Sequence, residues 1–341
     1  MNRPQTPKPP FNYNNEEVTF KNEKEGNLLT GTLTTPKNFS KKSVVLVMIT
    51  GSGTQNRDEE LFGHKAFLVI ADDFAQKGIA TLRLDDRGIG GSEKGKEGAT
   101  SADVADDISS AVNFLASRNY SNIGLIGHSE GGMISQMVAV SNKSVKFLVL
   151  TAAPGIEAIE VMVKQAYDIG KTSGLPEDAL NHNKAFNKKI YTYVAKYKGK
   201  NLEQDLKQVM TDVLKKMSTG QMSYELIENT ASEQAKALSN PWYRYFIAFN
   251  PDIYLSTLKI PILALNGSLD LQVSAKENLE GIKKSLTKAG NKNFDLVECD
   301  GLNHLFQTAK TGSPSEYGQI EETIAPKVLD IMSNWILKNA K

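Results

Sequence analysis

The stretch Ile123-Gly-Leu-Ile-Gly127-His-Ser129-Glu-Gly131-Gly132 decides the expected fold of this 341-residue chain. An apolar run leads into the pattern G-x-S-x-G, and an amphipathic segment follows it. This is the order of strand, sharp turn and helix in which a serine on a strained turn exposes its hydroxyl oxygen. Glycines beside the serine let the turn close. The stretch therefore predicts a nucleophile, Ser129, followed by a helix N-terminus that faces developing negative charge.

Apolar runs of strand length recur along the chain. They cover residues 44–49, 79–84, 123–126, 147–150, 260–265 and 294–297. Continuous runs of this kind are typical of strands buried on both faces. Helical patterns alternate with them, and one opens with the capping box Thr100-x-x-Asp103. The alternation predicts an α/β fold with a mostly parallel central sheet and helices on both faces.

The first 43 residues have a different character. Residues 1–15 form a polar, proline-rich arm, which we expect to be flexible because it cannot start a core. The beginning of the arm resembles the start of a mature protein from which a leader was removed. The sequence therefore leaves two locations open, an exported or periplasmic one and a cytoplasmic one. Segments 17–20 and 28–35, with a Gly-Asn turn between them, predict an antiparallel entry to the sheet.

Residues 154–250 show only helical spacing, without a comparable strand run. We therefore expect an inserted helical cap there, with the core formed by residues 16–153 and 251–341. Five aromatic side chains crowd near the end of the cap: Trp242, Tyr243, Tyr245, Phe246 and Phe249. They either pack within the cap or form a wall over the nucleophile that contacts the acyl part of a substrate. Trp242, Tyr243 and Phe246 are the candidate substrate-binding residues.

A serine nucleophile needs a base, and the chain has four histidines. His128 is adjacent to the nucleophile, and its side chain should diverge from the serine oxygen. His182 lies in a lysine-rich part of the cap, where a surface position is expected. His64 precedes an early helix, which is the wrong order along the chain. His304 lies in a loop between the last strand and the last helix and is the predicted base.

The acid that orients the base should follow the preceding strand. Asp270 emerges at the carboxyl end of the run 260–265. Its rivals are Asp252, which lies before that strand, and Asp300, which is close to His304 along the chain but expected to turn away. The order serine, aspartate, histidine is that of α/β-hydrolases. A helix-start residue is the alternative interpretation of Asp270.

An oxyanion formed at the serine needs two backbone N–H groups. One is expected from Glu130, the residue after the nucleophile. The other is expected from the glycine-rich loop after residues 44–49, with Ser52 as the donor and Gly53 as the alternative. The side chain of Glu130 is either a solvated carboxylate at a helix start or a group that disfavours anionic substrates.

Three motifs together resemble the α/β-hydrolase superfamily over about residues 16–340. The loop 51–58, GSGTQNRD, resembles the GSGPxxRD loop of bacterial carboxylesterases close to the serine aminopeptidase-like hydrolases, with Thr54 in place of the usual proline. Residues 85–92 match D-x-R-G-x-G-x-S, and residues 127–132 match the elbow of those esterases. The resemblance implies a serine esterase with a helical cap.

Charged side chains around these loops are expected to support them. Arg57, Asp58, Asp85 and Arg87 are better suited to a salt-bridged scaffold under the oxyanion loop than to catalysis.

Composition and motifs exclude several other classes of function. Forty Lys and Arg residues balance 39 Asp and Glu residues, which gives no basic surface for nucleic acid or an anionic membrane. Apolar runs are too short to span a bilayer. One cysteine, Cys299, excludes an internal disulfide. We expect no cofactor and no metal, because zinc-binding, paired-cysteine and dinucleotide motifs are missing from the sequence.

The resulting hypothesis is a carboxylesterase that acts on small or medium neutral acyl esters through an acyl-enzyme. A serine peptidase, a thioesterase or an acyltransferase of the same fold remains open, because a fold does not fix the substrate. A small-molecule receptor without catalysis is the alternative from a different class. The oligomeric state does not follow from the sequence.

Overall fold

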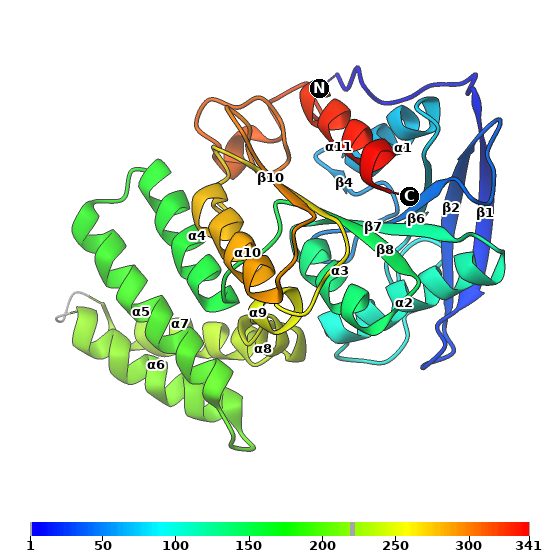
Figure 1. Cartoon of the computed structure of the whole chain (residues 1–341). Coiled ribbons are helices and arrows are strands. Elements are labelled where there is room, and N and C mark those ends of the chain that lie inside the picture. Colours follow the sequence, from blue (N-terminus) through cyan, green and yellow to red (C-terminus); the bar gives the residue numbers. More distant parts are fainter. Residues whose placement is uncertain (1, 219–221, 341) are drawn as a thin grey trace.

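A computed structural model describes residues 2–218 and 222–340, and its centre is an eight-stranded sheet (Figure 1). The strand order is β1-β2-β6-β3-β7-β8-β9-β10. The strands are β1 (Tyr13–Lys21), β2 (Leu28–Pro36), β3 (Val44–Ile49), β6 (Ala80–Leu84), β7 (Asn122–His128), β8 (Val145–Thr151), β9 (Ile262–Gly267) and β10 (Phe294–Cys299). A separate two-stranded hairpin consists of β4 (Glu60–Leu61) and β5 (His64–Lys65).

The strand directions follow from the sequence pattern. β2 runs antiparallel to both β1 and β6, and the remaining neighbours from β6 to β10 are parallel. All six residues of β3 are buried, as expected for an apolar strand covered on both faces. The prediction of a mostly parallel sheet with an antiparallel entry is confirmed. Because the parallel strands share a direction, their carboxyl ends lie along one edge of the sheet, where the candidate site residues follow β3, β7 and β9.

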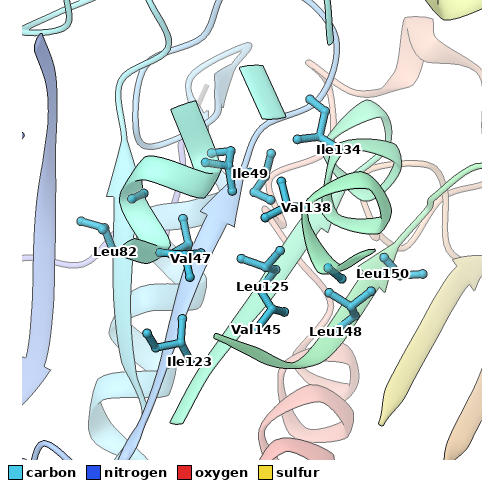
Figure 2. Packing of buried hydrophobic residues seen from close by; sticks show 14 of the residues in the cluster. Val47, Ile49, Leu82, Ile123, Leu125, Ile134, Val138, Val145, Leu148 and Leu150 are labelled. Atoms are coloured by element: carbon cyan, nitrogen blue, oxygen red, sulfur yellow. The ribbon is translucent and has the colours of Figure 1, made fainter. Parts of the chain in front are cut away.

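Helices cover both faces of the sheet. The first face packs against α2 (Ser101–Ser117), α3 (Glu130–Ser141) and α10 (Ala275–Ala289). The second face packs against α1 (Ala66–Gln76) and α11 (Pro326–Asn339). Figure 2 shows Ile134 and Val138 of α3 packed toward Leu125, Leu148 and Leu150 of the strands. This apolar layer fixes α3, and hence the turn before it, relative to the sheet. The predicted capping box is present at the start of α2.

Six helices lie between β8 and β9 and gather at the side of the sheet opposite β1 and β2 (Figure 1). They are α4 (Ala158–Thr172), α5 (Glu177–Lys196), α6 (Leu202–Ser218), α7 (Tyr224–Leu238), α8 (Pro241–Ile247) and α9 (Asp252–Leu255). Helices α5 to α8 share an apolar cluster of their own. Among the helices described, none combines the length and apolar character that crossing a membrane requires.

The proline-rich arm differs from the expectation of a flexible segment. The guanidinium of Arg3 donates hydrogen bonds of 2.8, 2.9 and 2.6 Å to the backbone carbonyls of Phe62, Gly318 and Ile320. The amide side chain of Gln5 bonds to the backbone of residues 323 and 324. Backbone groups near residue 62 and in residues 318–324 therefore hold the first residues of the arm in place. The predicted end of the arm at residue 15 is wrong, because residues 13–15 pair with β2 as the start of β1.

Candidate active site

Ser129 occupies the turn between β7 and α3. Its φ of 54° and ψ of −117° lie outside the regions that side-chain-bearing residues favour, and this turn exposes the side chain above the sheet. A side chain at Gly131 would collide with the backbone of Ile49 and Thr50. The glycine therefore lets the first turn of α3 approach the end of β3, as its place in the motif predicts.

His304 and Asp270 form a buried pair. Nδ1 of His304 lies 2.8 Å from Oδ2 of Asp270. The other carboxylate oxygen of Asp270 accepts the backbone N–H groups of Gln272 and Val273, each at 2.8 Å. These bonds fix the carboxylate, which in turn fixes the tautomer with the proton on Nδ1 and leaves Nε2 as an acceptor.

The rival acids lie elsewhere. Asp252 bonds to Ser285 and Lys288 on α10. Asp300 contacts the hydroxyl of Ser268. Of the three aspartates, Asp270 is the one that the structure pairs with the histidine.

Two of the other histidines are also separate from this pair. His64 is buried, and its Nδ1 and Nε2 bond to Thr323 and to the backbone oxygen of Tyr317. Burial lowers the pKa of His64 below its ordinary value. His182 is exposed on α5. Neither ring is bonded to an acid that could orient it as a base.

Ser129 and His304 line one cavity of about 300 Å³ beneath the cap. Gly51 and Ser52 of the glycine-rich loop line it as well. Most of the remaining wall is apolar and comes from Leu61, Phe67, Ile70, Val161, Met162, Trp242, Tyr243, Phe246, Val273, Leu305, Phe306 and Ile324. A largely apolar cavity with a few polar groups at one end is typical of a small-molecule site.

The glycine-rich loop passes close to the nucleophile. A methyl group built on Gly51 would lie 3.4 Å from Cβ of Ser129. Asp86 holds the loop from below, because its carboxylate accepts the hydroxyl of Thr50 at 2.9 Å and the amide of Gln55 at 2.7 Å. Burial raises the pKa of Asp86 to about 7. Asp86 is a site residue that the sequence reasoning did not identify.

The predicted scaffold of charged side chains is present around this loop. Arg57 donates to both carboxylate oxygens of Asp85, at 3.1 and 2.6 Å. Asp58 pairs with Arg83, a partner that the sequence pattern did not suggest. Arg87 extends the network away from the loop through bonds to Glu25, in the turn between β1 and β2, and to Asp107 of α2. A side chain paired in this way orients backbone and is not free to bind substrate.

The sequence profile of the family described as serine aminopeptidase, S33 matches residues 64–308, which span the elbow, the cap and both members of the histidine–aspartate pair. The chain belongs to this family. The α/β-hydrolase resemblance seen in the motifs is confirmed by that match. As a member of the S33 family, the chain is placed among serine hydrolases.

Individual relatives agree with this placement. The esterase EstD of Thermotoga maritima is 25% identical over 336 residues, which cover 96% of this chain and 69% of EstD. Among solved structures, the esterase Pf2001 of Pyrococcus furiosus superposes with a TM-score of 0.57 at 14% identity, covering 96% of this chain and 92% of that one. Est1E of Butyrivibrio proteoclasticus with ferulic acid bound gives 0.53 at 17% identity, with coverages of 94% and 98%. Both structures share the fold.

Of the two interpretations of Glu130 in this S33 hydrolase, the solvated carboxylate is wrong, and an effect on anionic substrates stays a prediction. Its side chain is buried, and Oε1 accepts the hydroxyl of Ser101 at 2.6 Å and the indole N–H of Trp242 at 2.8 Å. The carboxylate is therefore not solvated, and its bonding oxygen is occupied by protein donors. It joins the elbow to the cap.

The cap aromatics divide into two groups. Trp242, Tyr243 and Phe246 line the cavity, and the Trp242 ring stacks on that of Phe246 with centroids 5.4 Å apart. Phe249 and Tyr245 pack beneath the cap in an apolar cluster with Met133. Phe246 also packs against that cluster, so lining and packing overlap at this residue. Contact of the lining rings with the acyl part of a substrate stays a prediction.

His128 is a residue of the cavity wall that the sequence reasoning set aside as a base. Its side chain diverges from the serine, as expected, but its two ring nitrogens bond to Glu59 and to the backbone of His304. Glu59 also went unnoticed, although it directly follows the GSGTQNRD loop. Among the residues that the structure describes, no cluster of three His, Cys, Asp or Glu side chains is arranged to hold a metal ion.

Proposed function

We propose that this protein is a carboxylesterase that cleaves small or medium neutral acyl esters. The observation that carries the proposal is one cavity that contains Ser129 on its strained turn and His304 held by Asp270. The relationship to the esterase EstD supports the same chemistry. At about 300 Å³, the cavity is at the lower end of the range for small-molecule sites, which favours short and medium acyl groups.

The proposed reaction proceeds through an acyl-enzyme. Nε2 of His304 removes the proton from Ser129 as the serine oxygen attacks the ester carbonyl carbon. The resulting oxyanion accepts hydrogen bonds from the backbone N–H groups of Ser52 and Glu130. The first N–H groups of a helix have no partner within the helix, so Glu130 is suited to this role. His304 then protonates the leaving alcohol, and water, activated by the same base, releases the acid and restores Ser129.

The polar groups of the cavity favour esterase over aminopeptidase activity. An aminopeptidase must bind the α-ammonium group of its substrate, which calls for an unengaged carboxylate at the site. Glu59 is the one acidic side chain among the described residues of the cavity wall. Its Oε1 already accepts bonds from His128 and from the amide of Gly51. A neutral substrate therefore fits these walls better than a cationic one.

Two measurements test the proposal. We expect a fluorophosphonate probe to label the wild-type protein at Ser129, and p-nitrophenyl butyrate to be hydrolysed far faster than aminoacyl p-nitroanilides. Ser129→Ala should lose labelling and several orders of magnitude of esterase activity while keeping its far-UV circular dichroism spectrum.

The opposite results are equally informative. Wild-type turnover by a folded Ser129→Ala protein would refute the nucleophile, and faster cleavage of aminoacyl amides would make the chain a peptidase. Faster cleavage of thioesters than of matched oxygen esters would identify a thioesterase. A protein that is neither labelled nor active would fit a receptor.

A further inference from the structure

His128 makes a second histidine–carboxylate pair beside the first. It is the last residue of β7 and is buried. Nδ1 lies 2.9 Å from Oε1 of Glu59, and Nε2 lies 3.0 Å from the backbone oxygen of His304. The rings of His128 and His304 are adjacent, with centroids 4.8 Å apart and a tilt of 45° between their planes. His128 therefore contacts the proposed base, while its two ring nitrogens are bonded to groups other than Ser129.

These partners determine the charge of His128. A carbonyl oxygen can only accept, so Nε2 carries a proton. Oε1 of Glu59 already accepts the N–H of Gly51 at 2.9 Å, so Nδ1 is the donor of the second bond to this oxygen and carries a second proton. Burial lowers the pKa of His128, but the charge and hydrogen bond of Glu59, together with the backbone oxygen of His304 and the charge of Asp270, raise it above its ordinary value. His128 is then an imidazolium.

The ion pair connects two loops that approach Ser129 from different parts of the chain. Through Glu59 it holds the backbone of Gly51 at the start of the oxyanion loop. Through its other nitrogen it holds the backbone of His304. Glu59 itself has a φ of 49°, an unfavourable backbone conformation that its two bonds help to maintain.

We propose that His128, held as an imidazolium by Glu59, is a positioning residue that fixes the oxyanion loop and His304 on either side of Ser129. This role rests on the proposed function, because it acts through the base and the oxyanion hole. A displacement of about 1 Å in such groups can cost on the order of 10²-fold in rate. Removing the imidazolium should therefore lower kcat more than it changes KM.

The pair also acts on the base through its charge. The titratable groups that face His128 are Glu59, His304 and, behind His304, Asp270. With the imidazolium present, Glu59 is neutralised. Without it, the charge of Glu59 is no longer balanced at the position of the His128 ring, beside His304, and adds to that of Asp270, so the protonated, inactive form of the base is favoured. The acid limb of the pH–rate profile should then move to higher pH.

The experiment compares His128→Asn, Glu59→Gln and the double variant with wild type. The readouts are kcat and KM for p-nitrophenyl butyrate from pH 5 to 9, the rate of fluorophosphonate labelling, and the melting temperature. His182→Asn, the same substitution at an exposed position of the cap, is the matched control. We expect control values equal to those of wild type.

For His128→Asn we expect kcat to fall about 10–100-fold, labelling to slow in parallel, and KM to stay within about twofold. The acid limb should move to higher pH. In the double variant both charges are gone, so the limb should return toward its wild-type position while kcat stays low. A purely structural role would lower the melting temperature of His128→Asn. It would not shift the acid limb in that variant, nor return the limb to its wild-type position in the double variant.

Other outcomes overturn the proposal. A folded His128→Asn protein with kcat within about twofold of wild type and an unmoved acid limb would refute it. If His128→Asn does not fold, the near-isosteric Glu59→Gln decides, and wild-type kcat in that variant refutes the role. Failure of the proposed function looks different, because the wild-type protein itself would then be neither labelled nor active on esters.

Discussion

The carboxylate of Glu130 accepts a hydrogen bond from the indole N–H of Trp242 at 2.8 Å. Glu130 directly follows Ser129 and opens α3, whereas Trp242 lies in α8 of the cap. The bond therefore joins the residue whose amide is proposed to bind the oxyanion to a side chain in the cavity wall. Because both partners are at least partly buried, water competes weakly with the bond, and the ring has a defined place in the wall.

We predict that Trp242→Ala changes which acyl chains are preferred. The ring contacts a long chain more than a short one, so kcat/KM for p-nitrophenyl octanoate should fall relative to acetate by about 1–3 kcal/mol, or roughly 5–150-fold. Trp242→Phe keeps an aromatic ring but loses the N–H group, and its effect should be intermediate. The measurement is the ratio of kcat/KM values for the acetate, butyrate and octanoate esters.

The control for this prediction is Leu226→Ala, a truncation at an exposed position of α7. Its chain-length profile should match that of wild type. All three variants should still be labelled by the probe, since Ser129, His304 and Asp270 lie outside the cap. An unchanged chain-length profile in Trp242→Ala would show that the ring only packs within the protein and does not contact the acyl chain. Loss of probe labelling would mean that the cap helps to build the catalytic site.

We further predict that Asp270→Asn lowers kcat on the order of 10³–10⁴-fold with little change in KM, because the amide cannot hold His304 in the useful tautomer. The backbone bonds to Gln272 and Val273 can persist, so the fold should be retained. Asp252→Asn and Asp300→Asn are the matched controls and should leave the steady-state constants nearly unchanged. Greater damage from either control would reassign the acid.

Local sequence signals predicted the parts of this site that each depend on one short segment. Ser129 is specified by the residues on both sides of it, and Asp270 and His304 by their places after buried strands. These inferences need only that parallel strands end at one edge of a sheet. They placed the histidine–aspartate pair and the cavity-lining serine without any contact information.

Contacts between distant residues were beyond such reasoning. Glu59 and His128 are 69 positions apart, and Glu130 and Trp242 are 112 apart, so no spacing rule connects them. The direction of each side chain is set by tertiary packing. Glu130 was expected in solvent because a carboxylate at a helix start usually is, but the cap covers it. The sequence patterns did not show which distant segment packs against each loop.

Asp86 gives a prediction about pH and stability. Burial raises its pKa to about 7 in the folded protein, above the ordinary value of 3.8. A raised pKa contributes stability that is fully present below about 3.8 and is lost as the pH rises to about 7. Relative to Asp86→Asn, which cannot ionise, the wild-type free energy of unfolding should therefore fall between pH 4 and pH 8, by at most about 4 kcal/mol.

Urea unfolding of both proteins at pH 5 and pH 8 measures this difference. The comparison between the two proteins removes the contributions of the other ionisable groups, which both contain. A constant difference between the proteins at the two pH values would show that Asp86 does not titrate in this range. A difference that changes in the opposite direction would mean that its ionised form is the stabilised one.

The arm supplies the last prediction, because Gln5 bonds directly to the cavity wall. Its Oε1 accepts the amides of Thr323 at 2.6 Å and Ile324 at 3.1 Å, and both of these residues line the cavity. Gln5→Ala removes that acceptor. A loss of about 1–2 kcal/mol in local stability corresponds to roughly 5–30-fold faster hydrogen exchange of these two amides.

Hydrogen exchange measured on the full chain tests this directly, with Lys8→Ala at an exposed position of the same arm as the control. Exchange at residues 323 and 324 should accelerate in Gln5→Ala alone, while amides of the buried strand β7 keep their wild-type rates. The wall would then be less well ordered, and KM for esters should rise with little change in labelling of Ser129. Unchanged exchange in Gln5→Ala would show that the loop holds its shape without the arm.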